Sequence, residues 1–135
     1  MKPFLKKIEM ETKEKQSLTN IDHFVEEAVT ESGIEDGIVL IFCPHTTAAI
    51  TINENADLDV QRDLDLAYRE TFPNRAAFVH QEGNSDGHLK SSVTGTSEMV
   101  ILTNGKILFG TWQSLYFWDF DGPRNRHFFV KIVEG

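Results

Sequence analysis

Two stretches of the chain place apolar residues at helical spacing, and each predicts one helix. The apolar residues of the first stretch are Ile21, Phe24, Val25, Ala28 and Val29. Asn20 is placed to cap the start of this helix and Gly33 to end it, since a short polar side chain accepts from free N–H groups there. The apolar residues of the second stretch are Val60, Leu64, Ala67 and Tyr68. This helix is expected to start at Asn55 or Asp57 and to end at Pro73, because proline cannot continue a helix.

Most other apolar residues fall in short runs of strand length. The expected strands are residues 4–12, 38–42, 48–52, 78–79, 99–102, 107–109, 115–120 and 127–133. Asn104-Gly105 lies between two of these runs, which is a strong signal for a β-hairpin. The polar residues 13–20 and 80–97 are expected to be loops. The order β, α, β, β, α followed by strands predicts an α+β fold, a β-sandwich-like arrangement of largely antiparallel sheets with two helices.

Length and charge limit the class of protein. A chain of 135 residues suits a single domain, here residues 1–135. Its formal net charge of −8 argues against binding nucleic acid or an anionic membrane, because phosphates are bound by clustered Lys and Arg. No apolar run approaches the ~20 residues that span a bilayer, and no apolar signal-peptide core is visible. With Cys43 as the single cysteine, no internal disulfide can form, and a cytoplasmic location is expected.

The last two expected strands, residues 115–120 and 127–133, are apolar on nearly both faces. Two helices are too few to cover all the sheet surface of such a chain. Some apolar strand surface is therefore expected to remain exposed on a monomer, as it does where subunits of a homo-oligomer meet.

The first polar segment with candidate functional groups is residues 43–47, where Pro44 precedes His45, Thr46 and Thr47 between two strands. Imidazole and hydroxyl groups there are suited to catalysis or to binding. A simple turn whose hydroxyls satisfy backbone groups is the alternative. A Cys43/His45 nucleophile is disfavoured, because Pro44 is expected to bend the chain between the two side chains.

The second segment, residues 80–92, carries His80 and His88 on either side of Gly83 and Gly87. Neutral imidazole is the commonest side-chain ligand for zinc-like metals, and a compact loop brings both rings to one point. We therefore expect His45, His80 and His88 to converge on one metal ion or anion. A flexible loop with surface histidines is the alternative interpretation.

The third segment, residues 119–124, places Arg124 directly after Gly122-Pro123. A guanidinium held by such a turn matches phosphate or carboxylate in a bidentate manner, and Asp121 is the nearest candidate general base. A structural ion pair between Asp121 and Arg124 is the alternative. Glu54 is a further candidate acid or base, because it precedes the expected helix cap and is not explained by capping.

Several donors in these segments predict an anion site beside the histidines. They are Thr46, Thr47, Lys90, Ser91 and Arg124. Positive groups that are kept inside such segments of a strongly acidic chain suggest a local attraction for phosphate.

Together, the segments PHTTAAITINENAD, HQEGNSDGHLKSS and GTWQSLYFWDFDGPRNR resemble the YjbQ-like family of small proteins, whose members often carry the label secondary thiamine-phosphate synthase. The resemblance covers nearly the whole chain. It implies an α+β, β-sandwich-like fold, a homotrimer, and a polar site that contains His45, His80 and His88. The other positions that match the family pattern are Thr46, Thr47, Asn53, Glu54, Asn84, Lys90, Ser91, Trp112, Gln113, Asp121 and Arg124.

The resemblance makes thiamine-phosphate synthesis the leading activity, with Glu54, Asp121 and Arg124 as catalytic candidates. Thr46, Thr47, Asn84, Lys90, Ser91 and Gln113 would then bind substrate. A divalent cation is implied, but magnesium prefers oxygen ligands, whereas three histidines suit a zinc-like metal better. A metal-dependent hydrolase and a non-catalytic trimeric module that binds a metal or an anion are the alternatives.

Overall fold

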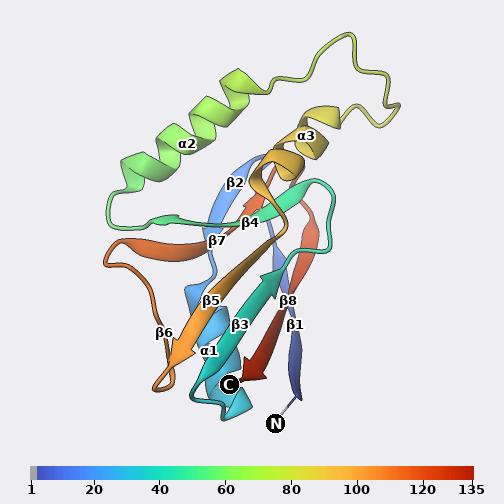
Figure 1. Ribbon diagram of the computed structural model, residues 1–135. Coiled ribbons are helices and arrows are strands. Elements are labelled where there is room, and N and C mark those ends of the chain that lie inside the picture. The colour runs from blue at the N-terminus through green and yellow to red at the C-terminus, as the bar shows by residue number, and fades with distance from the viewer. Residues whose placement is uncertain (1–2) are drawn as a thin grey trace.

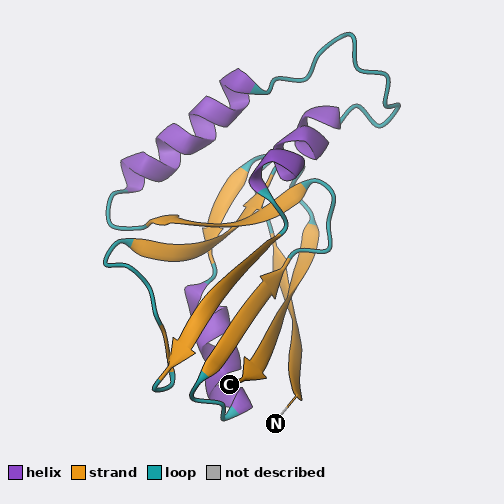
Figure 2. Cartoon of the chain, viewed as in Figure 1, coloured by secondary structure: helices purple, strands orange, loops and turns teal. Residues whose placement is uncertain are grey.

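The computed structural model describes residues 3–135 as eight strands and three helices in two antiparallel sheets (Figure 1 and Figure 2). The strands are β1 (Pro3–Glu11), β2 (Ser17–Asn20), β3 (Gly37–Phe42), β4 (Ala48–Glu54), β5 (Ser97–Thr103), β6 (Lys106–Ile107), β7 (Gln113–Asp119) and β8 (Asn125–Glu134). The helices are α1 (Asp22–Ser32), α2 (Leu58–Thr71) and α3 (Ser85–Thr94). The predicted α+β class with antiparallel sheets is confirmed.

The two sheets share the main core. The five-stranded sheet has the order β1-β8-β3-β5-β6, and the three-stranded sheet has the order β2-β7-β4. In Figure 1, β4 and β7 run across the direction of β3 and β5, while α2 and α3 lie at the opposite end of the molecule from α1. One buried cluster combines α1 with both sheets and includes Val25, Ile41, Ile50, Phe117 and Phe128. Removing these side chains from water is the main force that holds the sheets together.

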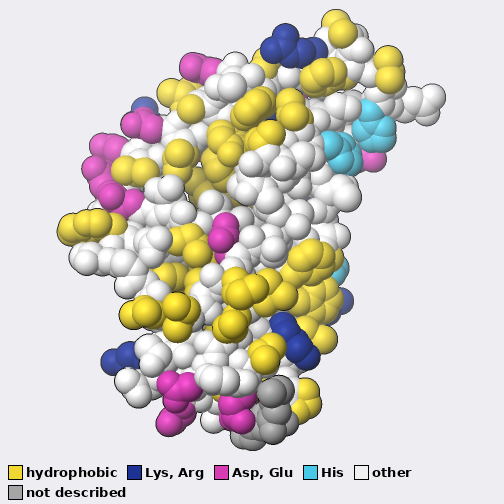
Figure 3. Space-filling view, in the orientation of Figure 1, with side chains coloured by type: hydrophobic (Ala, Val, Ile, Leu, Met, Phe, Trp, Pro, Cys, Tyr) yellow, Lys and Arg dark blue, Asp and Glu magenta, His cyan; other side chains and the backbone are white. Residues whose placement is uncertain are grey.

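The five-stranded sheet has a second face, which is apolar and exposed in the single chain. In β3, Val39 and Ile41 are buried, whereas Ile38 and Phe42 are more than two fifths exposed. The exposed apolar residues on this face are Leu5, Ile38, Phe42, Met99, Ile101 and Val133. This group is called the open face below, and part of it appears in yellow over β3 and β5 in Figure 3. Apolar strand surface is thus exposed on the single chain, as predicted, but mostly not on the two strands expected to provide it. Residues 115–120 are buried throughout, and in residues 127–133 only Val133 is among the large exposed apolar residues.

The two helices that periodicity predicts are present. Gly33 and Asp57 have the predicted roles at helix ends, whereas the N-cap of α1 is Ile21 and not Asn20. Asn20 Oδ1 accepts the N–H of Asp22 at the start of α1, and Gly33 ends that helix with a φ of 68°. Asp57 caps α2 by accepting the N–H of Asp59. The predicted hairpin turn is also present, since Asn104 and Gly105 both have positive φ.

Three expectations are corrected. Residues 85–94 form the helix α3 instead of a loop, residues 17–20 form the edge strand β2, and residues 78–79 are not a strand. Helix α3 escapes a periodicity argument because it has no apolar stripe, and the side chains it buries include Asp86, Lys90 and Ser91. Among residues 3–135, no helix is both long and apolar enough to cross a membrane.

Candidate functional site

His45 lies where the chain passes from the five-stranded sheet to the three-stranded sheet, between β3 and β4. Its ring packs against the ring of His127, with centroids 4.8 Å apart, and lies 6.4 Å from that of Phe117. The backbone N–H of His127 lies 3.0 Å from Nε2 of His45, and the carbonyl oxygen of His127 lies 3.1 Å from the same nitrogen. Because the backbone occupies Nε2, Nδ1 is the ring nitrogen left to meet a ligand.

The pKa of His45 is lowered from its ordinary value. Partial burial is the largest cause, since it penalises the charged ring, and the positive charge of Arg126 and the neighbouring His127 add to it. His45 is therefore a neutral imidazole at pH 7. A neutral ring can accept a proton or bind a metal, as a protonated ring cannot.

Arg126 lines the same pocket as His45 and is 5% exposed. Its Nε and Nη2 donate to the two carboxylate oxygens of Asp119 at 3.1 and 2.7 Å, and Nη2 also donates to the hydroxyl of Thr47 at 2.9 Å. Thr12 donates to Asp119 at 2.6 Å. Burial alone would raise the pKa of Asp119, but the hydrogen bonds from Arg126 and Thr12 outweigh it and lower that pKa. This bidentate pair fixes the floor of the site.

Arg126 and Asp119 were not among the residues that sequence reasoning selected. The signal was present, because Arg126 shares its strand face with Phe128, Val130 and Ile132, and all three are fully buried. A charged residue in line with three core positions requires a buried partner.

Arg124 makes a second, more exposed set of ion pairs. Its Nη2 donates to Asp121 Oδ2 at 2.7 Å and to Glu82 Oε2 at 3.1 Å, and its Nε donates to the carbonyl oxygen of Asp121 at 2.8 Å. Asn84 Nδ2 donates to the same two carboxylate oxygens. The pKa of Arg124 is raised, first by the charge of Asp121 and then by Glu82. Asp121 and Arg124 therefore form an ion pair, as the alternative interpretation predicted. The bonds made by Arg124 and Asn84 also connect residues 82–84 to the turn at residues 121–124.

His88 and His80 lie close together, with ring centroids 5.3 Å apart and planes nearly perpendicular. His88 lines one pocket with His45, whereas His80 is not among the residues that line it. Among residues 3–135, no group of three or more His, Cys, Asp or Glu side chains is placed to hold a metal ion. Within one chain, the donors therefore do not fit a preformed three-histidine metal centre.

These groups surround one pocket with a volume of about 270 Å³, called the histidine pocket below. Its lining residues are Pro44, His45, Thr46, Thr47, Glu82, Asn84, His88, Arg124 and Arg126. Asn84 Oδ1 is buried and has no hydrogen-bond partner in the part of the chain that the structure describes. A buried acceptor without a donor is costly, and a bound ligand or water relieves that cost.

Two of the predicted substrate-binding residues are placed outside the histidine pocket. Ser91 donates its hydroxyl to the carbonyl oxygen of Ala48 at 2.7 Å, which docks α3 onto β4. Lys90 is 3% exposed and lines a different pocket together with Asp86.

Glu54 and Gln113 also lie away from the histidine pocket. They pair with each other at the far end of β4 and β7, and six residue steps along β4 separate Glu54 from Ala48 by roughly 20 Å. Gln113 Oε1 accepts the N–H of Gly110 at 2.8 Å, so this side chain holds a turn. In one chain, Glu54 and Gln113 are therefore not brought together with His45.

Cys43 lies beside His45 in sequence but is buried. Burial raises the pKa of its thiol to about 11, so the sulfur stays protonated at neutral pH. This agrees with the expectation that Cys43 and His45 do not form a nucleophilic pair.

The fold and its pocket define a class of small α+β protein in which a neutral histidine and two carboxylate-paired arginines meet at the junction of two antiparallel sheets. Residues 6–135 match the family described as UPF0047 protein YjbQ-like. The chain belongs to this family, as its three motif segments suggested.

Relatives from microorganisms share the sequence over most of its length. The chain is 46% identical over 127 residues to UPF0047 protein MJ1081 of Methanocaldococcus jannaschii, covering 94% of this chain and 92% of the relative. It is 45% identical to UPF0047 protein YugU of Bacillus subtilis, covering 96% and 98% of the two chains.

Solved structures of the family superpose closely on this chain. An uncharacterised YjbQ/UPF0047 family protein of Clostridium acetobutylicum is 48% identical with a TM-score of 0.91, over 94% of this chain and 98% of that one. A protein of unknown function from Sulfolobus solfataricus is 32% identical with a TM-score of 0.93, over 99% of both chains. None of these names assigns an activity, so the site itself must carry the functional argument.

Proposed function

We propose that the histidine pocket binds a small phosphorylated molecule and that the protein is an enzyme acting on it. The observation that carries this proposal is the state of the two arginines. Arg126 binds its carboxylate through Nε and Nη2, whereas Arg124 binds carboxylates through Nη2 and a backbone carbonyl oxygen through Nε. In neither arginine does Nη1 have a partner among residues 3–135. The carboxylates thus orient each guanidinium while donors remain for a phosphate oxygen.

The other lining groups support an oxyanion ligand. Thr46 and Thr47 both line the pocket, and the hydroxyl of Thr47 lies beside Arg126. His45 is neutral and has Nδ1 left for a ligand, and His88 lines the same pocket from α3. Such a set can bind a phosphate and transfer a proton near it, which is what acid–base chemistry on a phosphorylated molecule requires.

Thiamine-phosphate synthesis is the candidate reaction. In that reaction, the thiazole ring nitrogen forms a bond to the methylene carbon of the pyrimidine, and the carbon–oxygen bond to pyrophosphate breaks. Pyrophosphate leaves with the bonding electrons, so the site must stabilise a developing anion. Arg124 and Arg126 are the groups suited to that task. The pocket of about 270 Å³ lies below the usual range for a whole ligand, and it suits one phosphate-bearing portion of the substrate.

A metal-dependent hydrolase is the second candidate, and the close pair of His80 and His88 favours it. Two imidazoles supply half of a tetrahedral zinc-like site, and further ligands would have to come from rearrangement or from another subunit. Magnesium fits less well, because it prefers oxygen ligands.

The proposed assembly is a homotrimer, as the family resemblance implies, in which the open face packs against other copies of the chain. The open face carries six exposed apolar residues, and large apolar patches usually mark interfaces. His127 lies on the same strand face as Phe129 and contacts His45, so the histidine pocket lies beside this interface. Glu54 and Gln113 would contribute to a site only if a neighbouring subunit brings them there.

The proposal is tested by measuring release of pyrophosphate and phosphate from thiamine-phosphate precursors and from a panel of small phosphorylated compounds. Turnover is expected for the wild type and is lost in His45→Ala and Arg124→Gln. The exposed Arg75→Gln lies outside the pocket and is the matched control. Elemental analysis of untagged protein and chelation identify a metal-dependent reaction. Phosphate binding without any turnover would instead support the non-catalytic module.

The trimer is tested separately by light scattering at micromolar concentration. The expected mass is that of three chains. A stable monomer would refute the assembly without touching the chemistry of the histidine pocket.

A further inference from the structure

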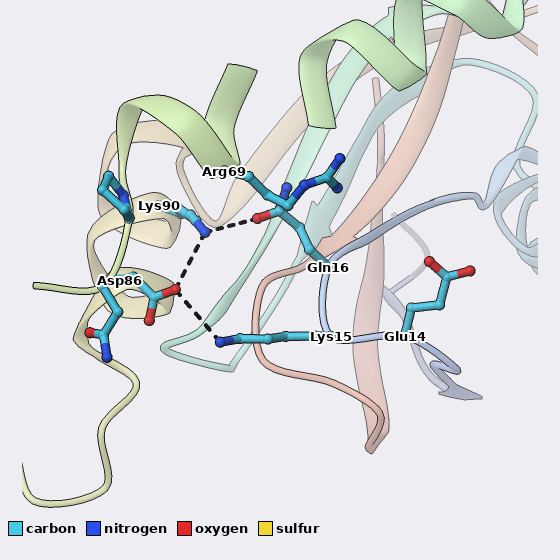
Figure 4. A pocket seen from close by; sticks show the side chains of 8 residues that line it. Glu14, Lys15, Gln16, Arg69, Asp86 and Lys90 are labelled. Atoms are coloured by element: carbon cyan, nitrogen blue, oxygen red, sulfur yellow. Dashed lines mark hydrogen bonds and ion pairs between the residues drawn. The ribbon is translucent and has the colours of Figure 1, made fainter. Parts of the chain in front are cut away.

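A second pocket lies on the other side of α3 from the histidine pocket. It has a volume of about 440 Å³ and lies between the end of α2, the loop between β1 and β2, and α3 (Figure 4). It is called the α2–α3 pocket below. Residues of an α-helix are rotated by about 100° per step, so Asp86 and Lys90 each point about 200° away from His88. One short helix therefore presents His88 to one pocket, and Asp86 and Lys90 to the other.

The wall of this pocket contains buried charges. Asp86 is 4% exposed and Lys90 is 3% exposed, and Gln16 beside them is also buried. Lys90 Nζ donates to Gln16 Oε1 at 2.8 Å and to Asp86 Oδ2 at 3.4 Å, while Lys15 Nζ lies 3.9 Å from the same Asp86 oxygen. Taking such charges out of water is costly, and the cost is recovered only when every donor and acceptor is used.

In the α2–α3 pocket, some of these hydrogen-bond donors and acceptors have no partner. Asp86 Oδ1 is buried and accepts no hydrogen bond from the described residues. The ammonium group of Lys90 has three donors, and two partners are present. Figure 4 shows Lys15 and Lys90 both reaching toward Asp86, whereas the side chain of Glu14 points away from them. The structure thus holds an unused acceptor and an unused donor a few ångströms apart.

Cationic side chains are concentrated around this pocket. Lys15, Arg69 and Lys90 line it together with the carboxylates of Glu14 and Asp86. Nη1 of Arg69 is paired with Asp65, so its remaining nitrogens are the ones left for a ligand. The whole chain has a formal net charge of −8. A concave site in which cationic side chains are concentrated attracts small anions.

We propose that the α2–α3 pocket is a second small-molecule site, which binds a small anion that also carries a hydroxyl group. The anionic group lies between Lys15, Arg69 and the free donor of Lys90. The hydroxyl group donates to the carboxylate of Asp86, which satisfies its second oxygen. This site is independent of the proposed chemistry in the histidine pocket and stands if that chemistry fails.

The test is a titration with glycerol 3-phosphate followed by amide shifts in two-dimensional NMR spectra of the intact protein. Saturable shifts are expected in residues 14–16, 69–74 and 86–90. Lys15→Gln and Arg69→Gln change exposed positions and should each weaken binding by about tenfold, roughly 1.4 kcal/mol. Lys13→Gln is the matched control, because Lys13 pairs with Glu11 and does not line the pocket. Arg124→Gln should leave binding here unchanged.

Several results would overturn the proposal. Absence of saturable shifts at millimolar ligand would do so, as would shifts confined to residues 44–47 and 124–126. Equal weakening by Lys13→Gln and Lys15→Gln would show a nonspecific charge effect. Inorganic phosphate should bind more weakly than glycerol 3-phosphate, and equal affinities would remove the role assigned to the hydroxyl group and Asp86.

Discussion

Two ion pairs are buried among residues 3–135, and they differ in how many of their hydrogen-bonding atoms have a partner. Asp119 accepts four hydrogen bonds, from two nitrogens of Arg126, from the hydroxyl of Thr12 and from the N–H of Asp121. Asp86 receives one long hydrogen bond from Lys90, and its second oxygen has no partner in the described chain. Arginine supplies a planar fork that matches a carboxylate, whereas lysine supplies a compact charge. The first pair therefore fastens the two sheets together, and the second leaves bonding capacity for a ligand.

The largest expected effect comes from breaking the satisfied pair. Asp119→Ala leaves Arg126 buried without its partner, and the free energy of unfolding should fall by about 3–5 kcal/mol. Urea denaturation measures this loss. Asp63→Ala on the exposed side of α2 is the control and should change little. A loss no larger than that of the control would show that the Arg126 pair is not structural.

Replacing both partners sharpens the comparison. Asp86→Leu combined with Lys90→Met should change the free energy of unfolding by no more than about 1 kcal/mol, because an unsatisfied pair contributes little beyond an apolar substitute. Asp119→Leu combined with Arg126→Met should cost several times more, since Thr12 and Thr47 lose their partners. Equal losses in the two double variants, measured by the same denaturation, would contradict the distinction drawn between the pairs.

His45 and Asp119 should affect the stability of the fold in different ranges of pH. The pKa of His45 is lowered from 6.5, so the unfolded chain binds a proton at that residue before the folded chain does. Stability should therefore fall as pH decreases below about 6.5, and this part of the profile should disappear in His45→Gln. The lowered pKa of Asp119 acts only in more acidic solution, as pH falls below its ordinary value of 3.8. Thermal melting from pH 8 down to about pH 2 covers both windows, and a profile between pH 8 and pH 5 that is unchanged in His45→Gln would contradict the assignment.

The smallest effect on stability is expected at the exposed arginine. Arg124→Gln should change the free energy of unfolding by about 0.5 kcal/mol or less, because its ion pairs lie at the surface. Its effect on ligand binding should be larger, since the rise in melting temperature that inorganic phosphate causes in the wild type should shrink. Phosphate protection that is equal in the two proteins would show that Arg124 does not hold the anion.

The sequence predicts the helices that carry apolar stripes, and it misses two elements without such a pattern, the helix α3 and the short edge strand β2. Helices α1 and α2 carry apolar stripes and recognisable ends, and the Asn104-Gly105 turn has a local cause. Helix α3 docks through polar groups, with Ser91 bonded to Ala48 and Gly87 close to Thr47. Such contacts depend on elements distant in sequence, so no local pattern reveals them.

The site was predictable only in part, because its assembly also depends on contacts between elements distant in sequence. His45, Thr47 and Arg124 come together because each lies at a strand end that meets the seam between the sheets. Glu54 and Gln113 belong to equally polar segments, but the length of β4 carries them to the other end of the three-stranded sheet. Composition identifies polar segments, whereas only strand direction and register decide which of them meet.

Helix α3 has a thermodynamic consequence because it forms a wall of both pockets. A ligand that shifts this helix on its Asp86 side also moves His88 on the other side. Any change in affinity that one ligand imposes on the other is then necessarily reciprocal, since both act on one equilibrium. A ten-residue helix docked by hydrogen bonds can move more readily than one locked by apolar packing. The polar character of α3 prevents its prediction from apolar periodicity, and it also suits the helix to couple binding at one pocket to binding at the other.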